Sequence, residues 1–197
     1  ILRDRLQDPS IASNVELFDE AKYNTNASVA ENILFGTPVG DEFTIENLGE
    51  NPYVLEVLDK CGLREELLKK GHRLAEIMVD LFQGLPPDHE FFERFSFISS
   101  DDLPEFQIIL RRAEQTGLES VEEEDRARLL ALPFKLIPAR HHLDLVDDEF
   151  QLRLLEARKE FCENLPENLA SFVEFFDLDN YNAASSVQDN ILFGKIA

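Results

Sequence analysis

The sequence from His141 to Glu149 holds two histidines and four carboxylates within nine residues. Such side chains are the common protein ligands of divalent metals. The spacing matches no known ligand pattern, however, and adjacent histidines on a helix point about 100° apart. We therefore predict no metal site, and we interpret the segment as a solvated loop whose acids begin a helix. A metal enzyme built on His141, Asp144 and Asp147 is the minor alternative.

The sequence also lacks the motifs of other kinds of catalytic site. A phosphate-binding loop requires G-x-x-x-x-G-K-[ST], so that backbone N–H groups and a lysine hold the phosphates. Gly194 and Lys195 resemble its end, but position 189 is Asp and position 196 is Ile. We interpret Cys61 and Cys162 as small core residues and not as nucleophiles. We predict no catalytic residue.

The most informative feature is an internal repeat, because twenty-residue segments rarely match by chance. Residues 17–36, here called the first repeat, read LFDEAKYNTNASVAENILFG. Residues 175–194, the second repeat, read FFDLDNYNAASSVQDNILFG, with eleven identities in twenty positions and a constant offset of 158 residues. This offset is far longer than a solenoid repeat. A duplicated element on both sides of an inserted segment, about 64–165, fits it better.

Each repeat carries the signals of a short capped helix. Ser28 precedes Glu31 by three residues, which is a capping box, and Ser186 with Asp189 repeats it in weaker form. Apolar residues then share one helical face, and each repeat ends in glycine, at Gly36 in the first copy. We expect these glycines to form left-handed C-terminal caps.

The repeated S-V-x-[ED]-N-I-L-F-G resembles the helix after the glutamine-bearing loop in the ATPases of ATP-binding cassette (ABC) transporters, especially exporters. Gln7-Asp8-Pro9 resembles the start of that loop, so the resemblance implies Gln7 as its glutamine. Residues 57–63 are similar to the continuation of the family's helical subdomain. The signature L-S-G-G-Q and the magnesium-binding strand do not occur. The resemblance covers about 60 residues, and 64–165 matches nothing.

The resemblance implies a helical accessory region that couples or regulates ATP-driven transport. It would lie on the cytoplasmic side of the plasma membrane. Its partners would be the remainder of the ATPase domain and the transmembrane domain. ATP and magnesium are implied for the full-length parent and not for this chain, which lacks a complete ATPase site and which we expect to be inactive alone. Exposed apolar faces could also drive a homodimer. The alternative is an acidic protein–protein interaction module.

Composition limits the class of protein. The chain has 197 residues, 44% of them hydrophobic, which suits one folded domain. Its charge of 19 − 40 = −21 repels nucleic acid. No apolar stretch approaches the roughly 18 residues of a membrane span, so we expect no direct membrane insertion. Because the sequence begins at Ile1 without Met, we interpret it as a fragment of a longer polypeptide.

The remaining pattern predicts a single all-α, irregular domain of roughly seven to nine helices, with at most a minor short strand. The clearest starts are Asn51-Pro52 and Asp147, and Ser120 with Glu123 predicts a further capping box. We expect Gly71 to split or bend its helix. Four further expectations concern a last helix over 167–176, a short strand at 134–137, core aromatics at 91–97, and an exposed acidic helix start at 122–125.

Overall fold

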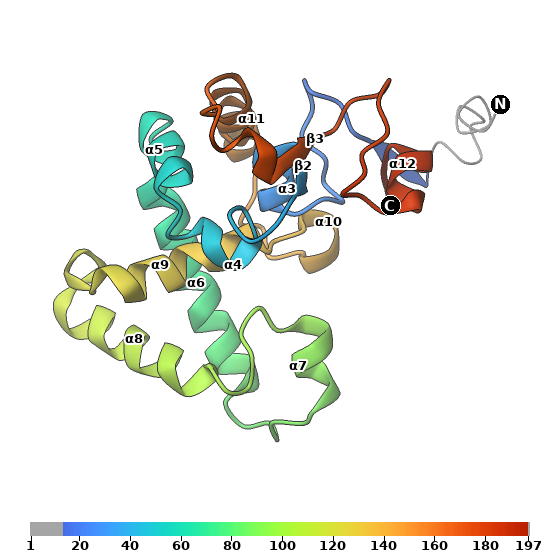
Figure 1. Cartoon of the computed structure of the whole chain (residues 1–197). Coiled ribbons are helices and arrows are strands. Elements are labelled where there is room, and N and C mark those ends of the chain that lie inside the picture. Colours follow the sequence, from blue (N-terminus) through green and yellow to red (C-terminus); the bar gives the residue numbers. More distant parts are fainter. Residues whose placement is uncertain (1–13, 197) are drawn as a thin grey trace.

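The computed structural model describes residues 14–196, so Gln7 lies outside the described residues. Within this range the chain is mostly helical, as predicted, but it is not strictly all-α (Figure 1). Ten α-helices and four short strands are present among the described residues. Their bounds are α3 (Val29–Leu34), α4 (Ile45–Leu48), α5 (Pro52–Lys60), α6 (Arg64–Phe82), α7 (Glu90–Phe95), α8 (Leu103–Thr116), α9 (Glu123–Phe134), α10 (Pro138–His141), α11 (Asp148–Glu163), α12 (Val187–Leu192), β1 (Val15–Leu17), β2 (Gly36–Pro38), β3 (Val173–Phe175) and β4 (Gly194–Ile196).

The longest helix, α6, packs against α9 and α8 at the centre of the helical region (Figure 1). Gly71 lies inside α6, which continues through it, so the predicted split is wrong. A Cβ at this position would meet the main-chain carbonyl of Leu129 in α9. The glycine therefore lets two helices approach closely, at the cost of a weaker helix former.

Apolar helix faces form the core. In α8 and α11 the apolar residues recur at steps of three and four residues, and both faces are buried. Together with α6 they bring these side chains into one cluster: Leu67, Leu68, Leu74, Ala75, Met78, Leu103, Phe106, Ile109, Leu110, Ala113, Phe150, Leu154, Ala157 and Phe161.

Helix starts follow the sequence at two of three places. Asn51 accepts from the N–H groups of Tyr53 and Val54, and Asp147 accepts from that of Phe150. The capping box predicted at Ser120 does not form, because Ser120 ends a 3-10 turn and α9 begins without a side-chain cap. Pro133 lies inside the last turn of α9.

The strands correct two predictions. Residues 167–176 form a 3-10 turn, Ala170–Phe172, followed by β3 instead of a helix. Residues 134–137 do not form a strand, since α9 ends at Phe134. β1 pairs antiparallel with β4, and β2 pairs antiparallel with β3. Each pair joins segments from opposite ends of the described chain.

Two surface expectations hold only in part. Phe97 is buried, but Phe91 is exposed on α7, so the aromatic stretch is not all core. At the start of α9, Glu124 pairs with Arg128, but Asp125 is buried and pairs with Arg112 at 2.9 Å. Among the helices of residues 14–196, none has a span that is both long and apolar enough to cross a bilayer.

Candidate functional site formed by the two repeats

The two repeats pair with each other in a reciprocal way. Leu17, at the start of the first repeat, lies opposite Gly194, at the end of the second. Phe175, at the start of the second repeat, lies opposite Gly36, at the end of the first. Leu17 is equivalent to Phe175, and Gly36 is equivalent to Gly194. The strand at the start of each repeat therefore pairs with the strand at the end of the other. The arrangement is that of an isologous dimer interface formed within one chain.

Aromatic rings lie at the centre of this arrangement. Phe18 and its equivalent Phe176 are stacked, with ring centroids 3.9 Å apart and planes 8° apart. The N–H of Phe18 donates to the carbonyl of Phe193, and the N–H of Phe176 donates to that of Phe35, both at 2.9 Å. Each stacked ring also meets one of these phenylalanines edge-on. The repeated Phe positions therefore hold the two copies together.

The repeat-ending glycines have a different role from the predicted one. The left-handed residues after α3 and α12 are Phe35 (φ 45°) and Phe193 (φ 49°), not Gly36 and Gly194. The glycines begin strands, where a Cβ at Gly36 would lie 2.7 Å from the Glu174 carbonyl oxygen. A Cβ at Gly194 would meet the equivalent carbonyl of Glu16. Glycine is needed here for close backbone approach between the repeats.

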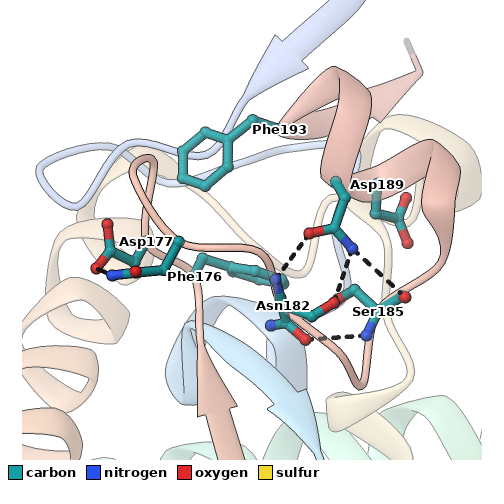
Figure 2. A pocket seen from close by; sticks show the side chains of 8 residues that line it. Phe176, Asp177, Asn182, Ser185, Asp189 and Phe193 are labelled. Carbon is teal, nitrogen blue, oxygen red and sulfur yellow. Dashed lines mark hydrogen bonds between the residues drawn. The ribbon is translucent and has the colours of Figure 1, made fainter.

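The side chain of an asparagine in each helix bonds to the loop before it, and this asparagine is buried in the first repeat and partly exposed in the second. Asn32 in α3 accepts from the N–H of Asn24 and donates to its carbonyl, both at 2.9 Å. Asn190 in α12 makes the same two bonds to Asn182, both at 2.8 Å. Figure 2 shows this second network, in which Asn182 also accepts from the N–H of Ser185. The N-I-L-F-G sequence thus builds the same local structure twice.

The predicted caps are present in both copies. Ser28 accepts from the N–H of Glu31, and the Glu31 carboxylate accepts from the N–H of Ser28, which completes the capping box. Ser186 accepts from the N–H of Asp189. Local hydrogen bonding therefore follows the repeated sequence closely.

Arg158 of α11 is seated in the first repeat. Its Nε donates to the main-chain oxygen of Asn32 at 2.6 Å and its Nη2 to the Oδ1 of Asn32 at 2.9 Å. Its Nη1 donates to the carbonyls of Asp19, Glu20 and Lys22 at 2.9 to 3.0 Å. The guanidinium also lies over the Phe35 ring, 4.6 Å from the centroid. Burial lowers the pKa of Arg158 to about 10, so the group is still charged at neutral pH.

The two repeats differ in what covers them. Val29 and Ile33 of α3 are 0% and 2% exposed because α11 packs on this helix. Their equivalents in α12, Val187 and Ile191, are 64% and 41% exposed. Figure 1 shows α12 set apart from α11, at the side of the molecule away from the helical region. The same apolar face is therefore core in one copy and surface in the other.

A small pocket lies at the second repeat, between its loop and its helix. It encloses about 10 Å³, and Figure 2 shows the side chains that line it. The lining includes Asp177, Asn190 and Phe193, which are the equivalents of Asp19, Asn32 and Phe35. Three of the lining residues are thus equivalent to residues that contact Arg158 in the first repeat.

An ion pair links the repeats at their edge. Lys195 of β4 contacts Glu31 of α3 at 2.8 Å. Burial alone would raise the pKa of the Glu31 carboxyl, but Lys195 and the donors of Ser28 hold it below its ordinary value. Lys195, directly after the second repeat, therefore supplies a positive charge beside Glu31 of the first repeat.

The residues considered for metal chemistry do not form a site. His141 accepts from the N–H of Ile137, and burial lowers the pKa of its imidazole. Asp147 caps α11, as the solvated-loop interpretation implies. Among residues 14–196, no group of three His, Cys, Asp or Glu side chains is placed to hold a metal ion.

The cysteines are partly buried and reduced in reactivity. Both are free thiols, and burial is the main cause that raises the pKa of each. The pKa of Cys162 rises to about 12. A raised thiol pKa lowers the fraction of thiolate, which is the form that acts as a nucleophile.

Comparison of the chain with protein-family models, curated proteins and solved structures finds no match. The candidate site is therefore defined by its geometry alone. The sequence analysis did not identify Arg158 as a functional residue. The one sequence feature that points to it is its position next to Ala157, at the edge of the buried face of α11. A charged residue at the edge of an apolar stripe is common on solvated helices, so this signal is weak.

Proposed function

We propose that the chain is a helical accessory region of an ABC transporter ATP-binding protein, which couples or regulates ATP-driven transport. The observation that carries the proposal is the S-V-x-[ED]-N-I-L-F-G motif and its structure. In both copies it forms a capped helix with an asparagine that bonds to the preceding loop and a left-handed phenylalanine. The motif therefore forms the same defined unit in both copies.

In this proposal the chain has no complete ATPase site of its own. Its sequence contains no phosphate-binding loop and no signature motif. It acts instead by joining the remainder of the ATPase domain to the transmembrane part, on the cytoplasmic side of the membrane. ATP and magnesium then bind outside these residues.

The experiment isolates the natural protein with an antibody raised against this chain and identifies the captured polypeptides by mass spectrometry. We expect a phosphate-binding loop and an L-S-G-G-Q signature, either in the polypeptide that contains this chain or in one bound to it. We also expect the captured material to hydrolyse MgATP, while the purified chain gives no heat of MgATP binding in calorimetry. ATP turnover by the purified chain, or capture without those motifs, would overturn the proposal.

The open face of α12 favours the interaction-module alternative, whatever the parent protein is. Aspartate in place of Ile191 should then reduce recovery of the captured complex. Leu81, which is 63% exposed on α6, provides the control position for the same substitution.

A further inference from the structure

A cleft of about 400 Å³ lies between three helices of the helical region, α4, α8 and α9. Its lining residues on α9 recur every three or four positions from Glu124 to Lys135, so they follow one side of that helix. The 135 − 124 = 11 steps between them span about 16 Å at a rise of about 1.5 Å per residue. Because a strand advances about 3.3 Å per residue, the cleft has the length of about five extended residues.

The walls of the cleft are held by close packing. A Cβ on Gly49 would lie 2.5 Å from the main-chain oxygen of Ala127, so the end of α4 lies directly against the backbone of α9 (Figure 1). A second wall is apolar and consists of Phe97, Ile98 and Phe106, which are buried in the core and reach the cleft only at their edges. The cleft therefore has an apolar side whose shape is fixed by the core.

The α4 side of the cleft carries carboxylates without counter-charges. Glu46 and Glu50 both line it, and both are exposed. Within residues 14–196, neither carboxylate takes part in an ion pair or a hydrogen bond. Glu50 also lines an adjoining cleft of about 360 Å³, together with Asp41 and Glu42. Four carboxylates therefore lie around α4, at the junction of the two clefts.

The basic side chains that line the cleft already have partners. Arg128 pairs with Glu105 and Glu124. The Nζ of Lys135 donates to the main-chain oxygen of Phe97 at 3.3 Å. Two basic groups and six carboxylates line the two clefts, 2 − 6 = −4, in a chain whose net charge is −21. A negative field of this kind attracts a cationic occupant and disfavours an acidic one.

We propose that the cleft between α4, α8 and α9 is a docking site for an extended basic segment of a partner protein. Successive side chains of an extended segment point in opposite directions. Apolar side chains at every second position pack against Phe97, Ile98 and Phe106. The basic side chains between them pair with Glu46 and Glu50. The inference goes beyond the proposed function and does not depend on it.

The test uses a fluorescently labelled peptide, KLKLK, with blocked termini. The peptide is titrated with the full chain, and binding is measured by fluorescence anisotropy at low ionic strength, where charges are little screened. We expect saturable binding of one peptide per chain. The peptide KSKSK keeps the charge but lacks the apolar side chains, and we expect it to bind about tenfold more weakly. The acidic peptide ELELE should not bind.

The chain variants then locate the site. Glu46→Gln combined with Glu50→Gln should weaken binding of KLKLK about fivefold or more, because two counter-charges are lost. Glu156→Gln combined with Glu163→Gln, on α11, removes the same charge elsewhere and should change binding less than about twofold. All four glutamates are exposed, so we expect both variants to keep the circular dichroism spectrum of the parent chain. The peptide comparison needs no chain variant, so the apolar requirement is tested even if a variant unfolds.

Four outcomes would overturn the proposal. The first is that KLKLK does not bind. Equal binding of KLKLK and KSKSK would mean that the apolar wall takes no part in recognition. Unchanged binding by the Glu46→Gln/Glu50→Gln chain would place the peptide elsewhere on the surface. Equal weakening by the α11 control variant would reduce the interaction to non-specific attraction by the net charge.

Discussion

The first and second repeats share eleven of twenty residues and the hydrogen bonds of their conserved asparagines, but only the first is buried. Asn32 and Asn190 make equivalent bonds, and Phe18 and Phe176 stack on each other. Ile33 is core, whereas Ile191 is surface. The local geometry of this motif is therefore determined by its serine cap, its asparagine and its final glycine. Its contribution to stability depends on which helix covers it.

The largest expected effect is at Arg158. Arg158→Met keeps much of the side-chain volume but removes every donor to Asn32 and the loop carbonyls, which leaves buried acceptors without partners. We expect a loss of about 4 kcal/mol in the free energy of unfolding, measured by urea denaturation. Lys159→Met, at an exposed neighbour on the same helix, should change it by less than about 0.5 kcal/mol. Equal effects at the two positions would contradict the role given to Arg158.

A matched pair of truncations tests the burial difference directly. Ile33→Ala opens a cavity under α11 and should cost about 3 kcal/mol. Ile191→Ala, at the equivalent position, should cost less than about 0.5 kcal/mol because the side chain is already exposed. Urea midpoints of the two variants under one condition give the comparison. Similar losses would mean that the second repeat is covered in solution.

Glycine substitutions test a feature that both repeats share, the close approach of the backbone at the final glycine. Gly36→Ala and Gly194→Ala each place a Cβ against the carbonyl of the partner strand and should each cost about 2 kcal/mol. Gly84→Ala is the control, since a Cβ there meets no atom within 4 Å. Thermal unfolding of all three variants is the measurement. A large loss at one repeat only would show that the pairing is not reciprocal.

The smallest expected effect is a pH dependence at Glu31. Its pKa is lowered in the folded protein, so its stabilising contribution is present above the ordinary carboxyl value and is lost as pH falls through the folded value. Glu31→Gln should therefore lower stability at pH 7, with a gap to the parent chain that narrows below about pH 4.5. Lys195→Met should also lower stability at pH 7, and its stability gap to the parent chain should likewise narrow as the pH falls. Urea midpoints from pH 7 to pH 3 give both curves.

Local features were predictable from the sequence because they depend on neighbouring residues. The cap of Asp147, the apolar face of α8 and the capping box at Ser28 follow from spacings of three and four residues. The repeat itself was visible as an identity of sequence. Predicting these features did not require knowing which helices and strands pack together.

The missed features depend on distant contacts. β3 is a strand because Gly36 brings β2 beside it, although the local spacing at 167–176 reads as a helix. Gly71 does not break α6 because α9 packs against it and compensates for the weaker helix former. Arg158 could not be recognised, since its acceptors lie more than a hundred residues earlier in the sequence. Such pairings are properties of the fold, and one sequence alone does not encode them in any local pattern.

The pairing of β1 with β4 also sets an order of events during synthesis. Val15 pairs with Ile196, a separation of 196 − 15 = 181 residues. At about 5 to 20 residues per second, a ribosome needs roughly 10 to 35 seconds to supply the partner strand. α11 leaves the ribosome earlier, so the first repeat receives its helical cover before its strands are complete. Among the strand pairings of residues 14–196, the one between β1 and β4 is therefore the last that synthesis can complete.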